Sequence, residues 1–331
     1  MNKKIAILGA GIAGVSTARL LSGVADTVLF DKARGVGGRM SVRRTEPYCY
    51  DHGAQYFTAR TVDFQNFIRP AIDSGLIKRW DARHVSFDRD SIVSRRNWLD
   101  DEPRYVGVPG MNSLVKHLSE GLTIHTKTKI TSLKRQKEFW ELLDEQGNIH
   151  RGYDWVITTV PSPQAAELLT PFFKHYEDVR SIQMRPCFSL MLGFSGKFPL
   201  EFDAAHVANT DVSWIGVNSS KPGRSNLPAL VVHSTERYAE EHLESDRDLI
   251  MKALCAETSR IIGRDVSGAD SKVLHAWHFA NNDRHVSSPC FIDQGLKLAA
   301  CGDWCQGGRV EGAFSSAANL VVKLKESLKE I

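Results

Sequence analysis

The first thirty residues contain two short apolar runs separated by a glycine-rich turn. Residues 5–8 and 27–30 are each long enough for one strand buried on both faces of a parallel sheet. The segment between them is mostly small and apolar, and its glycines stand where a helix would start. This order predicts a strand, a turn, a helix and a second strand, which is the beginning of an α/β fold.

Hydrophobic periodicity divides the rest of the chain into further helices and strands. Helical spacing of apolar residues predicts helices over 62–76, 246–262 and 310–329, and within 106–118 a Pro-Gly turn leads into a further amphipathic helix. Apolar runs and alternation predict several short strands within 80–98, and single strands over 122–126, 130–135, 139–143, 153–160, 187–194, 211–218, 230–234, 272–279 and 296–300. We expect residues 122–148 to be a strand meander with a hairpin turn at Gly147-Asn148, and residues 161–284 to be rich in strands with two helices.

The turn after the first apolar run has the spacing of a phosphate-binding loop. Gly9, Gly11 and Gly14 stand at G-x-G-x-x-G spacing between the predicted strand and helix. Gly9 allows the sharp turn, Gly11 lets the backbone approach a diphosphate, and Gly14 lets the helix lie against the strand. Asp31 follows about twenty residues later, where an acid accepts hydrogen bonds from ribose hydroxyls. These features predict a bound dinucleotide with its diphosphate at the helix N-terminus.

A second glycine cluster follows the acid directly. Residues 34–39 are Arg-Gly-Val-Gly-Gly-Arg. An NAD-binding Rossmann unit has no need of three further glycines and two arginines at this point. The approach of a second phosphate or of an isoalloxazine ring would explain them. The alternative is that Arg34 and Arg39 are solvated loop charges.

The string from Lys32 to Ser41, together with Asp-His-Gly-Ala-Gln-Tyr-Phe-Thr at 51–58, resembles the flavoprotein family of amine oxidases, desaturases and renalases, and within it the bacterial renalase branch. The resemblance implies that the Gly-Gly-Arg of the second cluster packs beneath an extended FAD. It also implies that Asp303, expected as an exposed carboxylate in a turn, contacts the ribityl or diphosphate region, and that the last helix points its N-terminus at the pyrimidine edge of the flavin. The cofactor-binding residues expected on these grounds are Gly9, Gly11, Ile12, Ala13, Gly14, Asp31, Lys32, Arg34, Gly38, Arg39, Met40, Asp303, Gly312 and Ala313.

The chain of 331 residues is long enough for two domains, and no linker, repeat or low-complexity tract separates them. With the resemblance, we expect an α/β protein in which the two domains are woven together. A discontinuous Rossmann-like FAD-binding domain would comprise residues 1–58, 105–160 and 286–331. A mixed-sheet α+β substrate domain would comprise residues 59–104 and 161–285.

Charge and apolar run lengths argue against several classes of protein. A net charge of +3 without any run of like charges does not indicate nucleic acid or an anionic membrane as a partner. Lys3 and Lys4 precede an apolar segment, but the spaced glycines and the lack of a cleavage site speak against a secretory signal. No window has the roughly 18 apolar residues of a membrane span. We therefore expect a cytoplasmic protein, and the sequence leaves its oligomeric state open.

The six cysteines are expected to be reduced thiols. Cys301 and Cys305 have the spacing of a metal or redox pair, but no second Cys/His pair is near to complete a zinc site, so we expect no metal. In covalent members of the amine oxidase branch, a cysteine carries the flavin from a longer loop before the closing segment. Here only Cys290 is near and the stretch 291–295 is too short, so we expect FAD to be held non-covalently.

Three residues are candidates for contact with a substrate. His233 ends an apolar strand, in the position where renalase-like sequences place a histidine on the flavin side. Alternation puts His275, Trp277 and Phe279 on one strand face, where Trp277 could stack on a planar ring. Both features are also compatible with an ordinary sheet core. Arg309 stands where the resembling amine oxidases carry a tyrosine of their substrate cage, and a guanidinium there would suit a dinucleotide diphosphate unless it is turned to solvent.

Motifs for other chemistry are missing, since the chain has no G-x-S-x-G elbow, P-loop or H-E-x-x-H. The flavin would therefore perform the chemistry. The first hypothesis is a renalase-type oxidase that takes hydride from 2- or 6-dihydro-NAD(P) isomers to flavin N5 and passes electrons to O2, giving NAD(P)+ and hydrogen peroxide. The second hypothesis is an FAD-dependent amine oxidase, and the third is a flavin-binding sensor without turnover.

Overall fold

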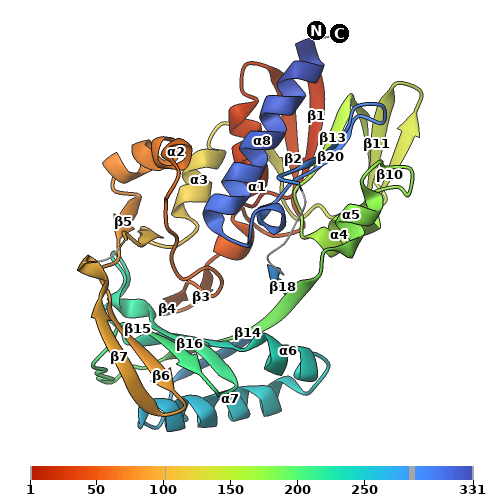
Figure 1. The fold of residues 1–331 in the computed structure, drawn as a ribbon. Helices are drawn as coiled ribbons and strands as arrows, with labels where there is room; N and C mark the ends of the chain where they lie inside the picture. Colours follow the sequence, from red (N-terminus) through yellow and green to blue (C-terminus); the bar gives the residue numbers. More distant parts are fainter. Residues whose placement is uncertain (1, 101, 283–287, 330–331) are drawn as a thin grey trace. The chain divides into compact units, whose positions relative to one another are not determined.

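The structure of the chain, a computed structural model, describes residues 2–100, 102–282 and 288–329. Two compact units are each assembled from segments that are distant in sequence (Figure 1). Unit 1 comprises Met1–Gly38, Val115–Met184 and Asn281–Ile331, and unit 2 comprises Arg39–Leu114 and Arg185–Ala280. The expected α/β fold with interleaved segments is therefore confirmed.

The boundaries of the units differ from those expected. Residues 39–58 and 105–114 belong to unit 2, and within the first of these segments Tyr48 and Tyr50 pack against the large sheet of that unit. Residues 161–184 belong to unit 1, because they form two short helices that follow its central sheet. The boundary expected near residue 285 lies outside the described residues.

A six-stranded sheet is the centre of unit 1, in the order β19-β20-β13-β1-β2-β9. All neighbouring pairs in it are parallel except β19 and β20. The strands are β1 (Lys3–Leu8), β2 (Ala25–Phe30), β9 (Thr123–His125), β13 (Trp155–Thr158), β19 (Phe291–Asp293) and β20 (Leu298–Ala300). Residues 5–7 of β1 are 0% exposed, as a strand covered on both faces requires. Helices α1 (Ile12–Leu20) and α8 (Val310–Lys329) pack against each other in this unit.

The expected meander is smaller than the sequence indicated. β10 (Ile130–Gln136), β11 (Phe139–Asp144) and β12 (Ile149–Tyr153) form an antiparallel three-stranded sheet, with a turn at Gly147 (φ +86°). The strand expected over 122–126 does not join them. It is β9, and it pairs in parallel with β2 because its three residues continue the central sheet. α3 (Ser113–Ser119), α4 (Ser162–Leu168) and α5 (Tyr176–Ser181) are short helices.

Unit 2 is built on a seven-stranded sheet in the order β18-β14-β17-β16-β15-β6-β7. β15 and β6 are parallel, whereas β14, β17 and β16 pair antiparallel in turn. The strands are β6 (Arg83–Asp88), β7 (Ser91–Asn97), β14 (Met184–Gly193), β15 (Ala204–Ala208), β16 (Val212–Val217), β17 (Ala229–Ser234) and β18 (Ser271–Asn282).

The two faces of this sheet pack against different partners. Phe188, Leu190, Leu192, Leu230 and Val232 share a core with α6 (Glu236–His242) and α7 (Arg247–Ile262). The alternate positions, including Met191 and Val231, pack with Tyr48 and Tyr50 on the opposite face. Since side chains alternate along a strand, His233 lies on this second face with Val231.

Shorter elements complete unit 2. β3 (Arg43–Thr45) pairs with β4 (Tyr48–Tyr50), and β5 (Ile77–Arg79) pairs with β8 (Tyr105–Gly107). α2 (Val62–Asp73) begins at Thr61, whose side chain accepts a hydrogen bond from the backbone N–H of Phe64. The expectation of two helices within 161–284 is wrong. The structure has α4 and α5 as well as α6 and α7, and these additional helices have only seven and six residues, too few for a periodic pattern.

Candidate functional site

The three glycines of the phosphate loop lie in unit 1 and are required for different reasons. Gly9 has φ +104°, a conformation that favours glycine. A Cβ on Gly14 would lie 2.0 Å from the carbonyl oxygen of Gly9, so this position accepts no side chain. A Cβ on Gly11 would meet no atom within 4 Å. Gly11 therefore faces open space at the start of α1, while Ile12 and Ala13 are buried beside it.

The N-terminus of α1 offers unpaired backbone donors toward this space. Gly11 is the N-cap residue and supplies no side-chain acceptor, and the first turn contains no acidic residue. The first N–H groups of a helix have no partner within the helix, and they carry the positive end of its dipole. The described residues at this turn therefore fit the diphosphate of a dinucleotide.

The second glycine cluster folds back onto this loop. The Gly37 N–H donates to the Ala10 carbonyl at 3.0 Å, and Gly11 and Gly37 form an isolated parallel bridge. Gly37 and Gly38 have φ +130° and +53°, which explains two of the glycines that an NAD-binding unit would not need. The side chains of Lys32 and Arg34 are exposed.

Asp31 holds the loop together with backbone hydrogen bonds. Its Oδ2 accepts from the Ala10 N–H at 2.6 Å, and its Oδ1 accepts from the Ala33 N–H at 2.8 Å. A carboxylate has about four lone-pair sites, so two remain for ribose hydroxyls. The expected ribose acid is therefore also a structural residue of the loop.

Arg39 and Met40 were expected beside the same cofactor, and the structure places them in unit 2. Arg39 Nη1 donates to the Ala280 carbonyl at 3.0 Å, and Met40 is buried. The backbone of Gly53 approaches Arg39 closely, since a Cβ on Gly53 would lie 2.0 Å from the Arg39 carbonyl oxygen.

The closing segment differs from the expectation at one residue. Asp303 is 7% exposed, so the expected exposed carboxylate is wrong. The chain tightens there into a short 3-10 helix, Asp303–Cys305, whose buried Trp304 donates from Nε1 to the Val160 carbonyl at 3.0 Å. Gly312 lies tightly against Gln306 and Ala313 is buried in the first turn of α8. Arg309 precedes α8 and is exposed.

A histidine–tryptophan cluster, formed by His52, His233, His275 and Trp277, lies in unit 2. The rings of His52 and Trp277 stack with centroids 4.9 Å apart, and His275 meets both rings edge-on. Trp277 Nε1 donates to the His52 carbonyl at 2.9 Å. Val273 packs with Tyr48 and Tyr50 while Leu274 and Ala276 pack on the helix side, so β18 alternates as expected and presents His275 and Trp277 on the same face as His233.

The histidines of the cluster are held neutral. Burial lowers the pKa of His52 to about 3 and the pKa of His233 to about 4. The pKa of His275 is also lowered, first by burial and then by Arg43. His52 Nδ1 is buried without a hydrogen-bond partner among the described residues. The sequence did not single out His52 or Gln55 as site residues, although both belong to the 51–58 string that carries the resemblance.

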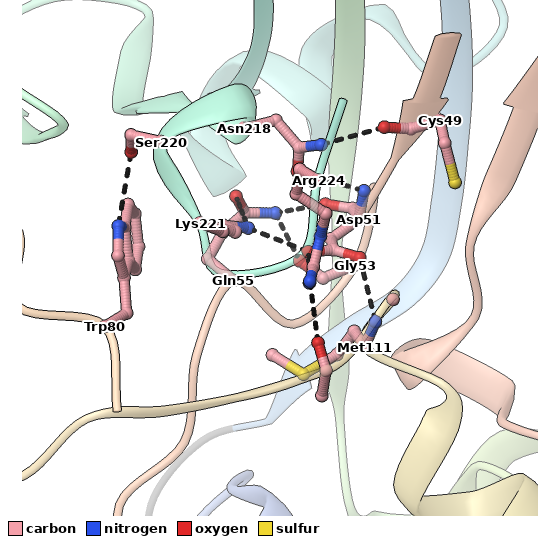
Figure 2. A network of polar contacts seen from close by, with 12 residues as sticks. Cys49, Asp51, Gly53, Gln55, Trp80, Met111, Asn218, Ser220, Lys221 and Arg224 are labelled. Carbon is pink, nitrogen blue, oxygen red and sulfur yellow. Dashed lines mark hydrogen bonds and ion pairs between the residues drawn. The ribbon is translucent and has the colours of Figure 1, made fainter. Parts of the chain in front are cut away.

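A buried ion network supports the loop that carries His52 (Figure 2). Asp51 Oδ2 pairs with Lys221 Nζ at 3.2 Å and with Arg224 Nη2 at 2.6 Å, and Asp51 Oδ1 accepts from the Met111 N–H at 2.9 Å. Burial would raise the pKa of Asp51, but Lys221 and Arg224 outweigh it and the pKa is lowered. Burial also lowers the pKa of Lys221 to about 8, against the attraction of Asp51. Hydrophobic periodicity did not predict this network, because Asp51, Lys221 and Arg224 lie outside helices and strands.

All six cysteines are free, and all but Cys49 are buried. Among the described residues, no group of three or more His, Cys, Asp or Glu side chains could hold a metal ion. Within the same residues, no helix combines the length and apolar character needed to cross a bilayer.

Comparison with known structures shows the fold. A structure from Exiguobacterium sp. 255-15, assigned as a protoporphyrinogen oxidase, superposes with a TM-score of 0.79 at 12% identity, covering 98% of this chain and 99% of that one. A putrescine oxidase bound to putrescine superposes with a TM-score of 0.71 at 12% identity, covering 98% and 99% of the two chains.

Comparison with sequence families shows the membership of the chain. Residues 7–69 match the NAD(P)-binding Rossmann-like domain. Residues 82–322 match the family described as flavin containing amine oxidoreductase. The expected FAD is confirmed as the cofactor, and the residues of the phosphate loop fit it. The chain therefore belongs to the flavin containing amine oxidoreductase family and is an FAD-dependent oxidoreductase.

Proposed function

We propose that the chain is an oxidase of renalase type that converts 2- or 6-dihydro-NAD(P) isomers to NAD(P)+. Bound FAD would supply the hydride acceptor at N5, and its reoxidation by O2, with one proton from solvent, would give hydrogen peroxide. The residues proposed to hold FAD are Gly9, Gly11, Ile12, Ala13, Gly14, Asp31, Lys32, Arg34, Gly38, Arg39, Met40, Asp303, Gly312 and Ala313.

The charge around the histidine–tryptophan cluster carries this proposal. Besides burial, Arg43 and Arg247 lower the pKa of His275, and Lys221 lowers the pKa of His233. Asp51, which precedes His52 in the chain, is already paired with two cations. Two positive charges about 4 Å apart repel each other by about 4 kcal/mol at an effective dielectric constant of about 20. This environment disfavours an ammonium ion more than a dinucleotide, whose dihydronicotinamide ring is neutral before hydride transfer and whose diphosphate is anionic.

The proposed oxidation of the substrate ring needs no acid or base, so it can take place beside neutral imidazoles. Loss of hydride from a 2- or 6-dihydronicotinamide restores an aromatic pyridinium, so no proton has to be removed from the ring. Trp277 and His233 are proposed to contact that ring by stacking and to keep water from it, and His52 fixes the plane of Trp277 by stacking on it. None of these roles requires a side chain that titrates near neutral pH.

Arg309 is a further cationic residue that supports the proposal. Its side chain is exposed and makes no hydrogen bond to any described residue. Its guanidinium can therefore make a bidentate contact with one phosphate of a dinucleotide. An amine substrate would lose the tyrosine that the resembling amine oxidases carry at this position.

An anaerobic titration of the purified holoenzyme tests the proposal. We expect 2- or 6-dihydro-NAD(P) to bleach the flavin absorbance within seconds, and benzylamine, catecholamines and polyamines at millimolar concentration to leave it unchanged. The variants His233→Ala and Trp277→Ala should retain FAD but reduce more slowly. Rapid bleaching by an amine with none by the nicotinamide isomers would instead assign an amine oxidase, the activity that the family description favours.

A further inference from the structure

Gln55 lies between a buried cation and His233. Lys221 Nζ donates to Gln55 Oε1 at 3.1 Å, and Gln55 Nε2 lies 3.5 Å from His233 Nε2 (Figure 2 shows the first contact). Lys221 is 2% exposed and is held by Asp51. Gln55 Nε2 also donates to the carbonyls of Asp51 and Gly53. The side-chain amide is therefore fixed at both ends.

The direction of these hydrogen bonds determines which nitrogen of His233 carries a proton. An ammonium group only donates, so the amide oxygen must face Lys221. Two backbone carbonyls surround the other end of the amide, and a carbonyl only accepts, so that end must be nitrogen. An amide nitrogen offers no lone pair to an imidazole N–H. The two amide hydrogens are shared among the carbonyls of Asp51 and Gly53 and His233 Nε2, which can only accept at this contact, so the single proton of the neutral ring is on Nδ1.

The surroundings of His233 oppose a second proton. Burial lowers the pKa of His233, and Lys221 acts in the same direction, whereas the backbone of His52 favours a proton on the ring. The strand neighbours opposite His233 are Ser189 on β14 and Trp214 on β16, which do not titrate near neutral pH. The titratable groups that act on it among the described residues are therefore Lys221 and His52.

We propose that Lys221, acting through Gln55, is a positioning residue that holds His233 as the neutral Nδ1–H tautomer with Nε2 as acceptor. The inference rests on the proposed function for what His233 contacts. The inference also explains why His233 should be neutral beside the substrate. The product ring is a pyridinium, and an imidazolium at His233 would repel this cation. Asp51 holds Lys221 in place through the ion pair at 3.2 Å.

The tautomer can be measured directly on the parent holoenzyme, without any donor. In a long-range nitrogen–proton NMR spectrum of protein labelled with nitrogen-15 in histidine, the His233 signals are those lost in His233→Asn. We expect one protonated Nδ1 and one unprotonated Nε2, unchanged from about pH 8 down to about pH 5.5, because one pKa unit changes the ratio of the two forms tenfold. A protonated Nε2, or an imidazolium at neutral pH, overturns the inference.

Gln55→Glu tests the role of the amide. A carboxylate only accepts, so we expect His233 Nε2 to become protonated and its pKa to rise by one unit or more. The anaerobic rate of flavin reduction should then fall about tenfold per pH unit below the new pKa. Gln65→Glu adds the same charge on the exposed side of α2 and should change neither readout.

Lys221→Met leaves only the carbonyls of Asp51 and Gly53 to orient the amide, and we expect a minor signal of the second His233 tautomer to appear beside the first. Unchanged His233 signals in a folded Gln55→Glu protein overturn the inference, and if both variants fail to fold, the parent spectrum decides alone. If 2- or 6-dihydro-NAD(P) does not bleach the flavin but the NMR spectrum of His233 is as expected, the proposed substrate is refuted. The positioning role of Lys221 then still stands.

Discussion

Asp31 shows how one residue can serve the fold of a loop and the binding of a ligand together. Its two carboxylate oxygens already accept backbone N–H groups from Ala10 and Ala33. The ribose hydroxyls of the cofactor would use the remaining lone pairs. Removal of the carboxylate therefore releases the loop as well as the ribose.

We expect Asp31→Ala to be purified with low FAD occupancy. A hydrogen bond to a charged group is worth about 1.5–3 kcal/mol, which is about ten- to a hundredfold in affinity. The ratio of flavin absorbance to protein after dialysis measures the occupancy. Asp26→Ala, an exposed position on β2, the strand that Asp31 follows, should keep the parent occupancy. Full occupancy of Asp31→Ala would show that another residue binds the ribose.

At the residue scale, sequence spacing predicted Gly9, Gly11, Gly14 and Asp31, because the loop is contiguous and its geometry follows from glycine and chain length. The sequence did not predict that His52 stacks on Trp277 or that Lys221 pairs with Asp51. These residues are separated by more than 150 positions in the chain, and no local pattern records their contact. The burial of Asp303 was missed for the same reason, since Trp304 reaches Val160 from far along the chain.

At the scale of elements, the turn between β1 and α1 contains two glycines that differ in the space available for a side chain. Gly14 has no room for a Cβ because the carbonyl of Gly9 lies where it would be. Gly11 has room in the protein, so only a ligand would meet its Cβ. A side chain at Gly14 therefore affects folding, whereas a side chain at Gly11 affects cofactor binding.

We expect Gly14→Ala to lower the free energy of unfolding and Gly11→Ala to leave it nearly unchanged. Backbone shifts forced by an extra group in a packed site typically cost about 1–3 kcal/mol. Gly11→Ala should instead lower FAD affinity, because its methyl group occupies the space of the diphosphate. Urea unfolding of the apoproteins and titration with FAD measure the two effects. Equal losses of stability in the two variants would contradict this division.

Long elements with clear periodicity were predicted within a few residues, as α8 and α7 show. α4 and α5 were missed because one to two helical turns leave no repeating pattern. β9 was placed in the wrong sheet, because a strand of only three residues does not record whether its partner strand is parallel or antiparallel.

At the scale of the whole molecule, buried neutral histidines make stability depend on pH. His233 has a pKa of about 4 in the folded chain and an ordinary value near 6.5 when unfolded. As pH falls below about 6.5, the unfolded chain takes up a proton that the folded chain does not, so the free energy of unfolding decreases until about pH 4. His52 acts in the same direction.

We expect a loss on the order of 3 kcal/mol for His233 alone between about pH 6.5 and about pH 4. Urea unfolding followed by tryptophan fluorescence across this range measures it. His233→Gln should reduce the slope, while His242→Gln, on α6, should retain it. A slope in His233→Gln equal to that of the parent would mean that this histidine does not titrate as described.

The packing of α1 against α8 sets a condition on biosynthesis. α1 leaves the ribosome early, and the helix that covers it is translated last of the described elements. Helix α1, which follows the phosphate loop, therefore stays uncovered until residues 310–329 have been translated. During that interval a nascent chain offers a surface for chaperones, and a stalled ribosome would release a fragment that is unable to retain flavin.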